Sequence, residues 1–182
     1  MRLIACAVLA VASATAAAAA PSGGRASDTV LGDGCLVVQN GFGKVSVSLA
    51  RGALFGRFQS GTITIDAASV VEKRAKVTGL GAIPVRAKIG DRPAYQYGPV
   101  DLVRFRVTGP VRMIVSDGIF IDLSVVGRGT AWLTSFGWQP PLDVDTNVFS
   151  VDAASFCEDN FQPLPSTLRP VRYAIAASDA AG

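Results

Sequence analysis

Apolar and polar residues alternate one by one along several short segments of this 182-residue chain, and no other feature limits its fold as much. Successive side chains of a β-strand point to opposite faces, so strict alternation buries one face and exposes the other. Segments of this kind cover residues 44–49, 62–66, 103–108, 111–116 and 119–124. The pattern predicts an all-β fold built from antiparallel strands.

Glycine-containing signals separate these segments. Asn-Gly and Asp-Gly supply the positive φ that tight hairpins need. The signals are Asn40-Gly41, Arg51-Gly52, Ser60-Gly61, Gly109-Pro110, Asp117-Gly118 and Gly127-Arg-Gly129. We therefore expect turns between strands at these positions and, over residues 34–165, an antiparallel two-sheet β-sandwich.

Two conformations fit the sequence of residues 67–77, a short helix and a strand. Asp66 would be its N-cap, and the charged residues 72–74 would be exposed. Val70 and Val71 argue equally for a strand, because β-branched side chains favour extended backbone. The expected fold is therefore all-β with room for one short helix.

Residues 1–20 have the features of a secretory signal peptide. Arg2 supplies a minimal positive charge, and the apolar residues 3–11 are too few to span a bilayer. Alanines follow, and we expect cleavage near Ala18 to Ala20, with a retained membrane anchor as the alternative. A lipoprotein reading through Cys6 is rejected, since only five residues precede that cysteine. The mature protein is expected to be secreted or extracytoplasmic, without a transmembrane segment after cleavage.

Composition divides the rest of the chain into a leader, a domain and a tail. Residues 21–33 are expected to be a flexible leader, residues 34–165 the β-sandwich domain, and residues 166–182 a flexible tail. Cys35 and Cys157 remain after cleavage, and an even count in an oxidising compartment predicts one disulfide. Closing a loop of about 120 residues stabilises a fold by about 4–5 kcal/mol in the chain-entropy model. Two separate buried thiols are the alternative.

Several chemistries are excluded by composition. The chain has no histidine, which removes Ser-His-Asp and Cys-His nucleophile systems and histidine metal ligands. Two mature cysteines cannot form a four-thiolate zinc site or hold an iron–sulfur cluster. Lys plus Arg is 17 and Asp plus Glu is 14. Cleavage would remove Arg2, and the remaining net charge of +2 is too small for a surface that neutralises phosphates. We expect no cofactor and no nucleic-acid partner.

One acidic segment has part of a calcium-loop pattern. Asp143, Asp145 and Asn147 have the one-three-five spacing of an EF-hand loop, but Val148 stands where that loop needs glycine. We therefore expect no EF-hand. A Ca²⁺ site of another type, with Asp152, stays open, and a plain polar loop is the alternative.

The other acidic side chains of the chain give only weak support to a hydrolase that works with two carboxyl groups. Glycosidases hold two carboxyl groups about 5–10 Å apart on either side of a sugar. The chain has only two glutamates, Glu72 and Glu158, and its aspartates fall on turns and strand edges. The sequence pairs none of them across a cleft, and we expect no catalytic residue.

Aromatic and basic side chains are the features most typical of a ligand surface. Exposed aromatic faces stack on sugar rings or pack on a partner, and Trp132 is expected to face outward because its neighbours are apolar. Arg104, Arg106 and Arg112 would form one basic face if their strands pair. Packing within the sheet and a solvated face with aspartate partners are the alternatives. The candidate surface residues are Trp132, Phe136, Trp138, Arg104 and Arg106.

Motifs of turns and strand edges occupy residues 41–47, 51–58, 61–66, 103–106, 118–130 and 161–165. Together they resemble uncharacterised secreted β-rich proteins of high-GC bacteria, a group with no known activity. The resemblance covers residues 34–165 and implies a fold, but it implies no activity, cofactor or site residue.

These features favour a non-enzymatic exported module that binds a cell-wall polymer or an envelope protein. The alternative is a self-associating structural or assembly protein that pairs through an open sheet edge. A carboxylate-based hydrolase is the third hypothesis, and a pocket that holds two acidic side chains would support it.

Overall fold

The computed structural model describes residues 34–136, 146–152, 157, 161–167 and 169–172. In this part of the chain the fold is all-β and antiparallel, as predicted, with a single short helix. No helix among these residues is long and apolar enough to cross a membrane. The expected signal peptide and leader, residues 1–33, lie outside the described residues. The elements are β1 (Gly34–Asp66), α2 (Ala67–Val71), β2 (Ala75–Leu80), β3 (Pro84–Ile89), β4 (Arg92–Thr108), β5 (Val111–Ser135), β6 (Val148–Asp152), β7 (Gln162–Pro163) and β8 (Arg169–Arg172).

Strands β1 and β5 are 33 and 25 residues long, several times the usual length of a strand. Each one bends repeatedly, and different stretches of it occupy different places in the sheet. Val45 of β1, for example, pairs with both Val115 and Leu133 of β5. The expected turn at Gly109-Pro110 is present, since it separates β4 from β5. The turns expected at the other five glycine signals are wrong, because β1 continues through Asn40-Gly41, Arg51-Gly52 and Ser60-Gly61, and β5 continues through Asp117-Gly118 and Gly127-Arg-Gly129.

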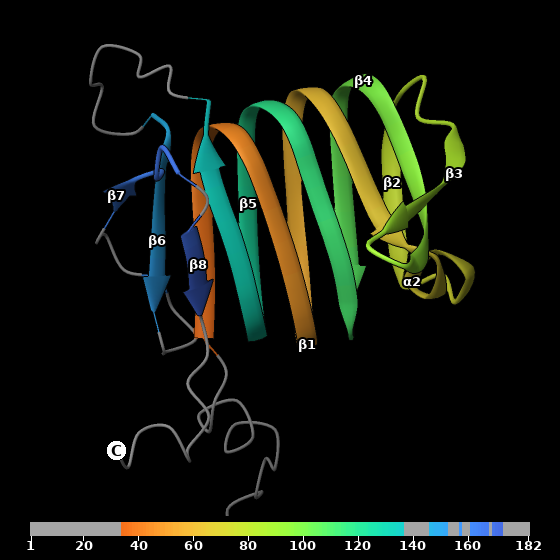
Figure 1. Cartoon of the computed structure of the whole chain (residues 1–182), viewed down its shortest axis with the longest axis horizontal. Helices are drawn as coiled ribbons and strands as arrows, with labels where there is room; N and C mark the ends of the chain where they lie inside the picture. The colour runs from red at the N-terminus through yellow and green to blue at the C-terminus, as the bar shows by residue number, and fades with distance from the viewer. Residues whose placement is uncertain (1–33, 137–145, 153–156, 158–160, 168, 173–182) are drawn as a thin grey trace, which may run out of the picture.

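The bent strands form two facing layers (Figure 1). The sheet winds like a flattened coil, so that the same hydrogen-bonded sheet passes from one layer to the other. The expected sandwich of two separate sheets is therefore not confirmed. Layer 1 consists of residues 34–39, 53–58, 103–108 and 122–127 with β2 and β6. Layer 2 consists of residues 43–49, 62–66, 94–97, 111–116 and 129–135 with β3 and β8.

The hydrophobic core lies between the two layers. The apolar residues that set the alternation are buried in one cluster, as predicted, except Ile119, which is exposed because it lies in the bend at residues 117–120. Each such valine, leucine or isoleucine contributes about 1.5–3 kcal/mol on burial. Layer 1 contributes Leu36, Leu54, Val103, Phe105, Leu123 and Val125, and layer 2 contributes Val45, Val47, Ile63, Ile65, Met113 and Leu133.

Two glycines allow the strands to cross closely where they bend. Gly52 and Gly127 pair with each other and have φ values of +120° and +143°. A Cβ on Gly127 would lie 2.1 Å from the carbonyl oxygen of Arg51, and a Cβ on Gly52 would lie 2.1 Å from that of Val126. The glycine signals at these positions therefore mark backbone that requires glycine, but the backbone bends between layers instead of reversing.

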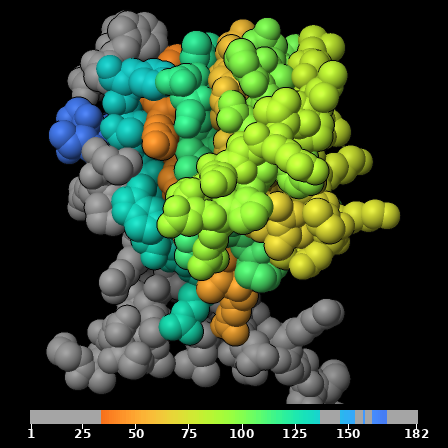
Figure 2. Space-filling view, turned by 45° about the vertical axis from the view of Figure 1, so that its right-hand side comes forward, coloured from red at the N-terminus to blue at the C-terminus, as the bar shows by residue number. Residues whose placement is uncertain are grey.

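The bends gather on two opposite rims. Bends at residues 40–43, 59–61, 98–102 and 117–120 form the upper rim, at the top of Figure 1. Bends at residues 50–52, 109–110 and 127–128, with α2, form the lower rim. Along the coil, β2 and β3 lie at one end and β6, β7 and β8 at the other. Figure 2 turns the first end toward the viewer and shows the yellow to light-green segments packed over it.

The predicted disulfide is present. Cys35 and Cys157 have an S–S distance of 2.11 Å and a Cα–Cα distance of 5.6 Å. Cys35 is the second residue of β1 and lies opposite Asp152 of β6, so the bond fastens Cys157, which follows β6, to the first strand. The chain also forms structure beyond residue 165. Residues 169–172, expected to belong to a flexible tail, form β8 and pair with residues 130–133, a long-range pairing that no local alternation reveals.

Both readings of residues 67–77 are partly right. Residues 67–71 form α2, and Asp66 is its N-cap as predicted, since its side chain accepts a hydrogen bond from the Ser69 backbone N–H at 2.9 Å. The chain returns to a strand at Ala75. Arg74, expected to be exposed with its neighbours, is half-buried because its guanidinium folds onto the carbonyl groups of Thr108 and Pro110.

Candidate functional site

The aromatic candidates lie on layer 2 and at the upper rim. Trp132 faces outward from layer 2 as predicted, between the fully buried Ala131 and Leu133, and it is half-buried. It lines a hollow of about 230 Å³ together with Ile89 and Arg112. Phe136 follows the end of β5 and is exposed, and Trp138 lies outside the described residues.

The arginine candidates lie on the other side of the molecule. Arg104 and Arg106 are exposed on the outer face of layer 1. Arg112 does not join them, because it lies on layer 2 opposite Ser48, and strands β4 and β5 are separated by stretches of β1. The expectation of one face with Arg104, Arg106 and Arg112 is therefore wrong. The structure does not bring Trp132 together with Arg104 and Arg106 either.

The strand register places two further cations on the outer face of layer 1. Arg57 lies opposite Arg104, and Lys76 lies opposite Arg106. All four side chains are exposed. Phe55, opposite Arg106, is 59% exposed on the same face. Sequence reasoning missed Arg57, Lys76 and Phe55 because only the register shows which strands are neighbours.

Two adjoining hollows lie on this face. They have volumes of about 630 Å³ and 520 Å³ and share Asn40, Arg57, Arg104 and Asp122. We call the two together the basic groove. The first hollow adds Gln39, Phe55 and Ser124 among its lining residues, and the second adds Gln59, Thr78, Leu102 and Phe120. Cations, neutral polar groups and apolar side chains thus line the groove together.

Asp122 is the carboxylate among the described residues that line the groove. Its Oδ2 lies 2.8 Å from the Arg57 Nε, and its Oδ1 accepts the Asn40 backbone N–H at 2.9 Å. These contacts hold Arg57 in place, although its side chain is 67% exposed. Within the described part of the chain, no carboxylate pairs with Arg104, Arg106 or Lys76. Arg104 lines the groove, and Arg106 and Lys76 lie next to it on the same face, so this face carries an excess of positive charge.

The groove can bind anions. A guanidinium group offers a planar fork of N–H donors that matches a carboxylate, phosphate or sulfate group. Phe55 provides an exposed aromatic face against which a sugar ring can stack. A hydrolase of the two-carboxylate type needs a second acidic side chain across the site. The described lining supplies Asp122, which Arg57 already holds.

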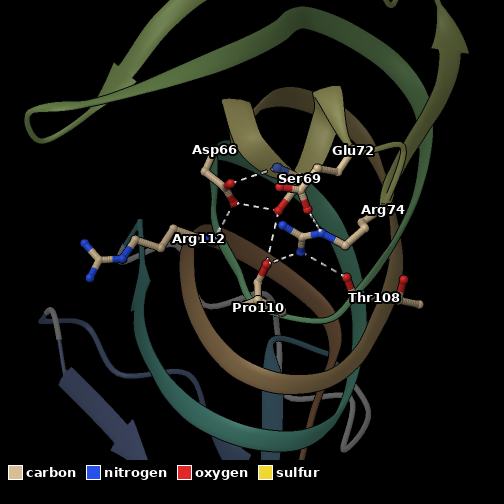
Figure 3. A network of polar contacts seen from close by, with 7 residues as sticks. All are labelled: Asp66, Ser69, Glu72, Arg74, Thr108, Pro110 and Arg112. Atoms are coloured by element: carbon tan, nitrogen blue, oxygen red, sulfur yellow. Dashed lines mark hydrogen bonds and ion pairs between the residues drawn. The ribbon is translucent and has the colours of Figure 1, made fainter.

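A second polar cluster lies at the lower rim (Figure 3). The Asp66 carboxylate accepts hydrogen bonds from the Ser69 N–H, the Ser69 hydroxyl and the Arg112 N–H, each at 2.9 Å. Arg74 pairs with Glu72 at 2.6 Å and donates to the carbonyl groups of Thr108 and Pro110. These bonds join α2 to the connection between β4 and β5, so we assign the cluster a role in the fold.

The acidic segment at residues 143–147 is only partly described. Asp143 and Asp145 lie outside the described residues, whereas Asn147 is buried beside the bend at residues 40–43. The Asn147 Oδ1 accepts the Phe42 N–H at 3.0 Å, and its Nδ2 donates to the Ser135 hydroxyl at 3.1 Å. Asn147 therefore fastens the upper rim to the end of β5. No group of three or more metal-binding side chains occurs among the residues with a described position.

Comparison of the chain with protein-family models, with curated proteins and with solved structures finds no match.

Proposed function

We propose that this protein is a non-enzymatic, exported binding module, and that its basic groove binds an anionic polymer of the cell envelope. The strand register supports this most strongly, because it sets Arg57 beside Arg104 and Lys76 beside Arg106. Like charges at opposed positions destabilise a sheet. A carboxylate or phosphate group bound between the cations removes that repulsion, so the arrangement suits an anionic ligand.

The other groups of the groove fit a carbohydrate chain that carries acidic groups. Gln39, Thr78 and Ser124 offer amide and hydroxyl groups for hydrogen bonds to sugar hydroxyls. Phe55 offers its exposed ring for stacking. Because the two hollows adjoin, successive units of one polymer can occupy both.

Export is supported by the signal-like residues 1–20 and by the disulfide. Disulfides form and persist mainly in oxidising compartments outside the cytoplasm. The bond between Cys35 and Cys157 therefore fits a protein that meets envelope polymers.

The edges of the sheet oppose the alternative of a self-associating structural protein. Among the described strands, those at the edges of the sheet are β2, β3, β7 and β8. Proline and lysine on an edge strand hinder pairing with another chain. Lys76 lies in β2, Pro84 and Lys88 lie in β3, Pro163 lies in β7, and Pro170 lies in β8.

Fluorescence anisotropy with a labelled poly(glycerol phosphate) and with neutral dextran tests the proposal. We expect the full chain to bind the anionic polymer and not the dextran. The double variant Arg104→Gln/Arg106→Gln should bind at least about 10-fold more weakly, because a hydrogen bond to a charged group contributes about 1.5–3 kcal/mol. The affinity should also fall as the salt concentration rises.

A matched pair of arginines serves as the control. Arg112 and Arg128 are exposed, but they lie on layer 2 and at the lower rim, away from the basic groove. The double variant Arg112→Gln/Arg128→Gln makes the same change in net charge and should bind the polymer as the parent does. Trp132→Ala should also leave this binding unchanged. Equal losses in the two double variants, or no binding by the parent, would overturn the proposal.

A further inference from the structure

Large apolar side chains are exposed along the upper rim. Leu80, Leu102 and Ile119 line one hollow of about 500 Å³ at this rim, and Leu102 and Phe120 both line the neighbouring part of the basic groove. Leu102 is 63% exposed and Phe120 is 43% exposed. These four side chains form one connected surface, which we call the apolar rim.

The backbone of the apolar rim is strained at two residues. Leu102 and Phe120 both have a φ of +51°, in the left-handed region that bulky residues avoid. Strain of this kind persists mostly at functional positions. Leu102 is mostly exposed, whereas the Phe120 ring packs edge-on against Phe42 at a centroid distance of 4.8 Å and is exposed on its other side.

We propose that the apolar rim docks on a lipid bilayer and inserts its side chains at the boundary between headgroups and acyl chains. The surface is formed by the tips of separate bends at one end of the molecule, and tips of this kind can enter a soft interface (Figure 1). Arg57 and Arg104 lie beside it, in the hollow that contains Leu102 and Phe120, and Asp122 in the same hollow pairs with Arg57, so Arg104 is the cation there that faces no described carboxylate. Exposed cations next to an apolar surface complement anionic lipid headgroups.

The distribution of charged side chains indicates which of the two rims would enter the bilayer. The lower rim carries Glu72, Lys73 and Arg128, all exposed, and is unsuited to insertion. The upper rim also carries two exposed carboxylates, Asp101 and Asp117, which weaken the attraction to anionic headgroups. Insertion of the apolar side chains therefore provides most of the affinity, and the basic groove adds to it when anionic lipid is present. The apolar rim shares Leu102 and Phe120 with the second hollow of the basic groove, but its insertion into a bilayer does not require a bound polymer.

Sedimentation of the full chain with vesicles tests the inference. One set of vesicles contains phosphatidylcholine alone, and the other also contains phosphatidylglycerol. We expect binding to both sets, with tighter binding to the second. The double variant Leu102→Asn/Phe120→Asn should bind both sets at least tenfold more weakly. Asparagine tolerates left-handed backbone, so these substitutions remove apolar surface without adding strain.

Val71→Asn is the matched control. Val71 is 68% exposed on α2 at the lower rim, so its replacement removes exposed apolar surface away from the apolar rim. We expect this variant to bind vesicles as the parent does. Failure of the parent to sediment with either set of vesicles, or undiminished binding by the Leu102→Asn/Phe120→Asn variant, would refute the proposal. Dimerisation in light scattering that this variant abolishes, without vesicle binding, would assign the surface to a second copy of the chain.

A further variant separates this inference from the proposed polymer site. Arg104→Gln/Arg106→Gln should lose polymer binding but keep its binding to phosphatidylcholine vesicles, because the apolar rim is intact. The variant Leu80→Asn/Ile119→Asn changes the two residues of the apolar rim that lie outside the basic groove, so it should bind vesicles more weakly but keep its binding to poly(glycerol phosphate). The two proposals can therefore fail independently of each other.

Discussion

Gly127 lies where β5 bends over β1, and no other residue type fits there. Its φ is +143°, and a Cβ would lie 2.1 Å from the carbonyl oxygen of Arg51. Because the contact is with backbone, no side chain can move aside. We expect Gly127→Ala to lower the free energy of unfolding by about 3 kcal/mol or more, measured by urea denaturation.

Gly90 provides the control for this substitution. Its φ is +59°, and nothing lies within 4 Å of where a Cβ would be. Gly90→Ala should therefore cost only the strain of left-handed backbone, about 1–2 kcal/mol. If the two substitutions have equal effects, the close crossing at Gly127 does not hold the layers together as described.

Tyr97 is a buried tyrosine whose ionisation opposes folding. Burial raises the pKa of its hydroxyl above the ordinary value of 10.0, and the nearby Tyr95 raises this pKa further. In the unfolded chain the group ionises near the ordinary value, so its contribution to stability is fully present below about pH 10. That contribution is lost as the pH rises from there toward the folded-state pKa. The free energy of unfolding should therefore fall above about pH 10, and it should fall less in Tyr97→Phe.

Chemical denaturation of the parent and of Tyr97→Phe, from neutral pH to about pH 11, measures this effect. The other ionisable groups are the same in both proteins, so the difference between the two curves isolates Tyr97. Parallel curves over the whole range would contradict the prediction.

At the scale of single residues, alternation in the sequence predicts which side chains face the core. The buried positions of Val45, Val47 and Leu49 follow directly from it. The alternation also predicts that Trp132 faces outward. It does not predict what lies beside an outward-facing residue, and for that reason Arg57 and Phe55 were missed at the candidate site.

The strands themselves show a limit of local sequence patterns. Asn40 and Asp117 have φ values of +46° and +55°, and positive φ is what a tight hairpin turn requires. Hairpins and bends thus share the local backbone conformation that these sequences favour. Whether the chain reverses or continues depends on pairing with distant strands. The sequence therefore locates the bends but does not show that β1 and β5 pass through them.

The helix α2 depends on Asp66 for its attachment to the sheet (Figure 3). The Asp66 carboxylate caps the helix and also accepts the Arg112 N–H, at the start of β5. Asp66→Ala removes the cap and leaves that N–H without its partner. We expect a loss of about 1–3 kcal/mol in the free energy of unfolding and faster hydrogen exchange at the Ser69 and Arg112 amides.

Asp91 offers a comparison for Asp66→Ala. It is exposed in the turn between β3 and β4, and none of the described hydrogen bonds or ion pairs involves its side chain. Asp91→Ala should change the free energy of unfolding by less than about 0.5 kcal/mol. Slow, unchanged exchange at Ser69 and Arg112 in Asp66→Ala would show that α2 is held by packing alone.

For the whole molecule, the order of strands could not be derived from the sequence. Leu36 lies opposite Val125, and Arg57 lies opposite Arg104, although each pair is far apart along the chain. No local pattern encodes such pairing. The all-β class and the disulfide could be predicted, because they follow from alternation and from cysteine count and compartment. The sequence could not predict that Arg104 and Arg106 lie on layer 1 whereas Trp132 lies on layer 2.

The disulfide affects the stability of the whole fold, because it closes most of the described sheet into one covalent loop. Cys35 and Cys157 are 122 residues apart in sequence. A cross-link over such a loop lowers the entropy of the unfolded chain, and the chain-entropy model gives about 4–5 kcal/mol of stabilisation. Replacing both cysteines in Cys35→Ser/Cys157→Ser should therefore lower the free energy of unfolding by up to about this amount, measured by urea denaturation under oxidising conditions.

Reduction of the parent provides the control, since it breaks the same bond without changing the sequence. The parent in reductant should approach the stability of the double variant, whereas the reductant should not affect the variant itself. The stretch at residues 34–39 still pairs with β5 and β6 without the bond, so the native fold should persist with lower stability. Equal stability of the parent and the variant would mean that strand pairing alone holds the first strand in place.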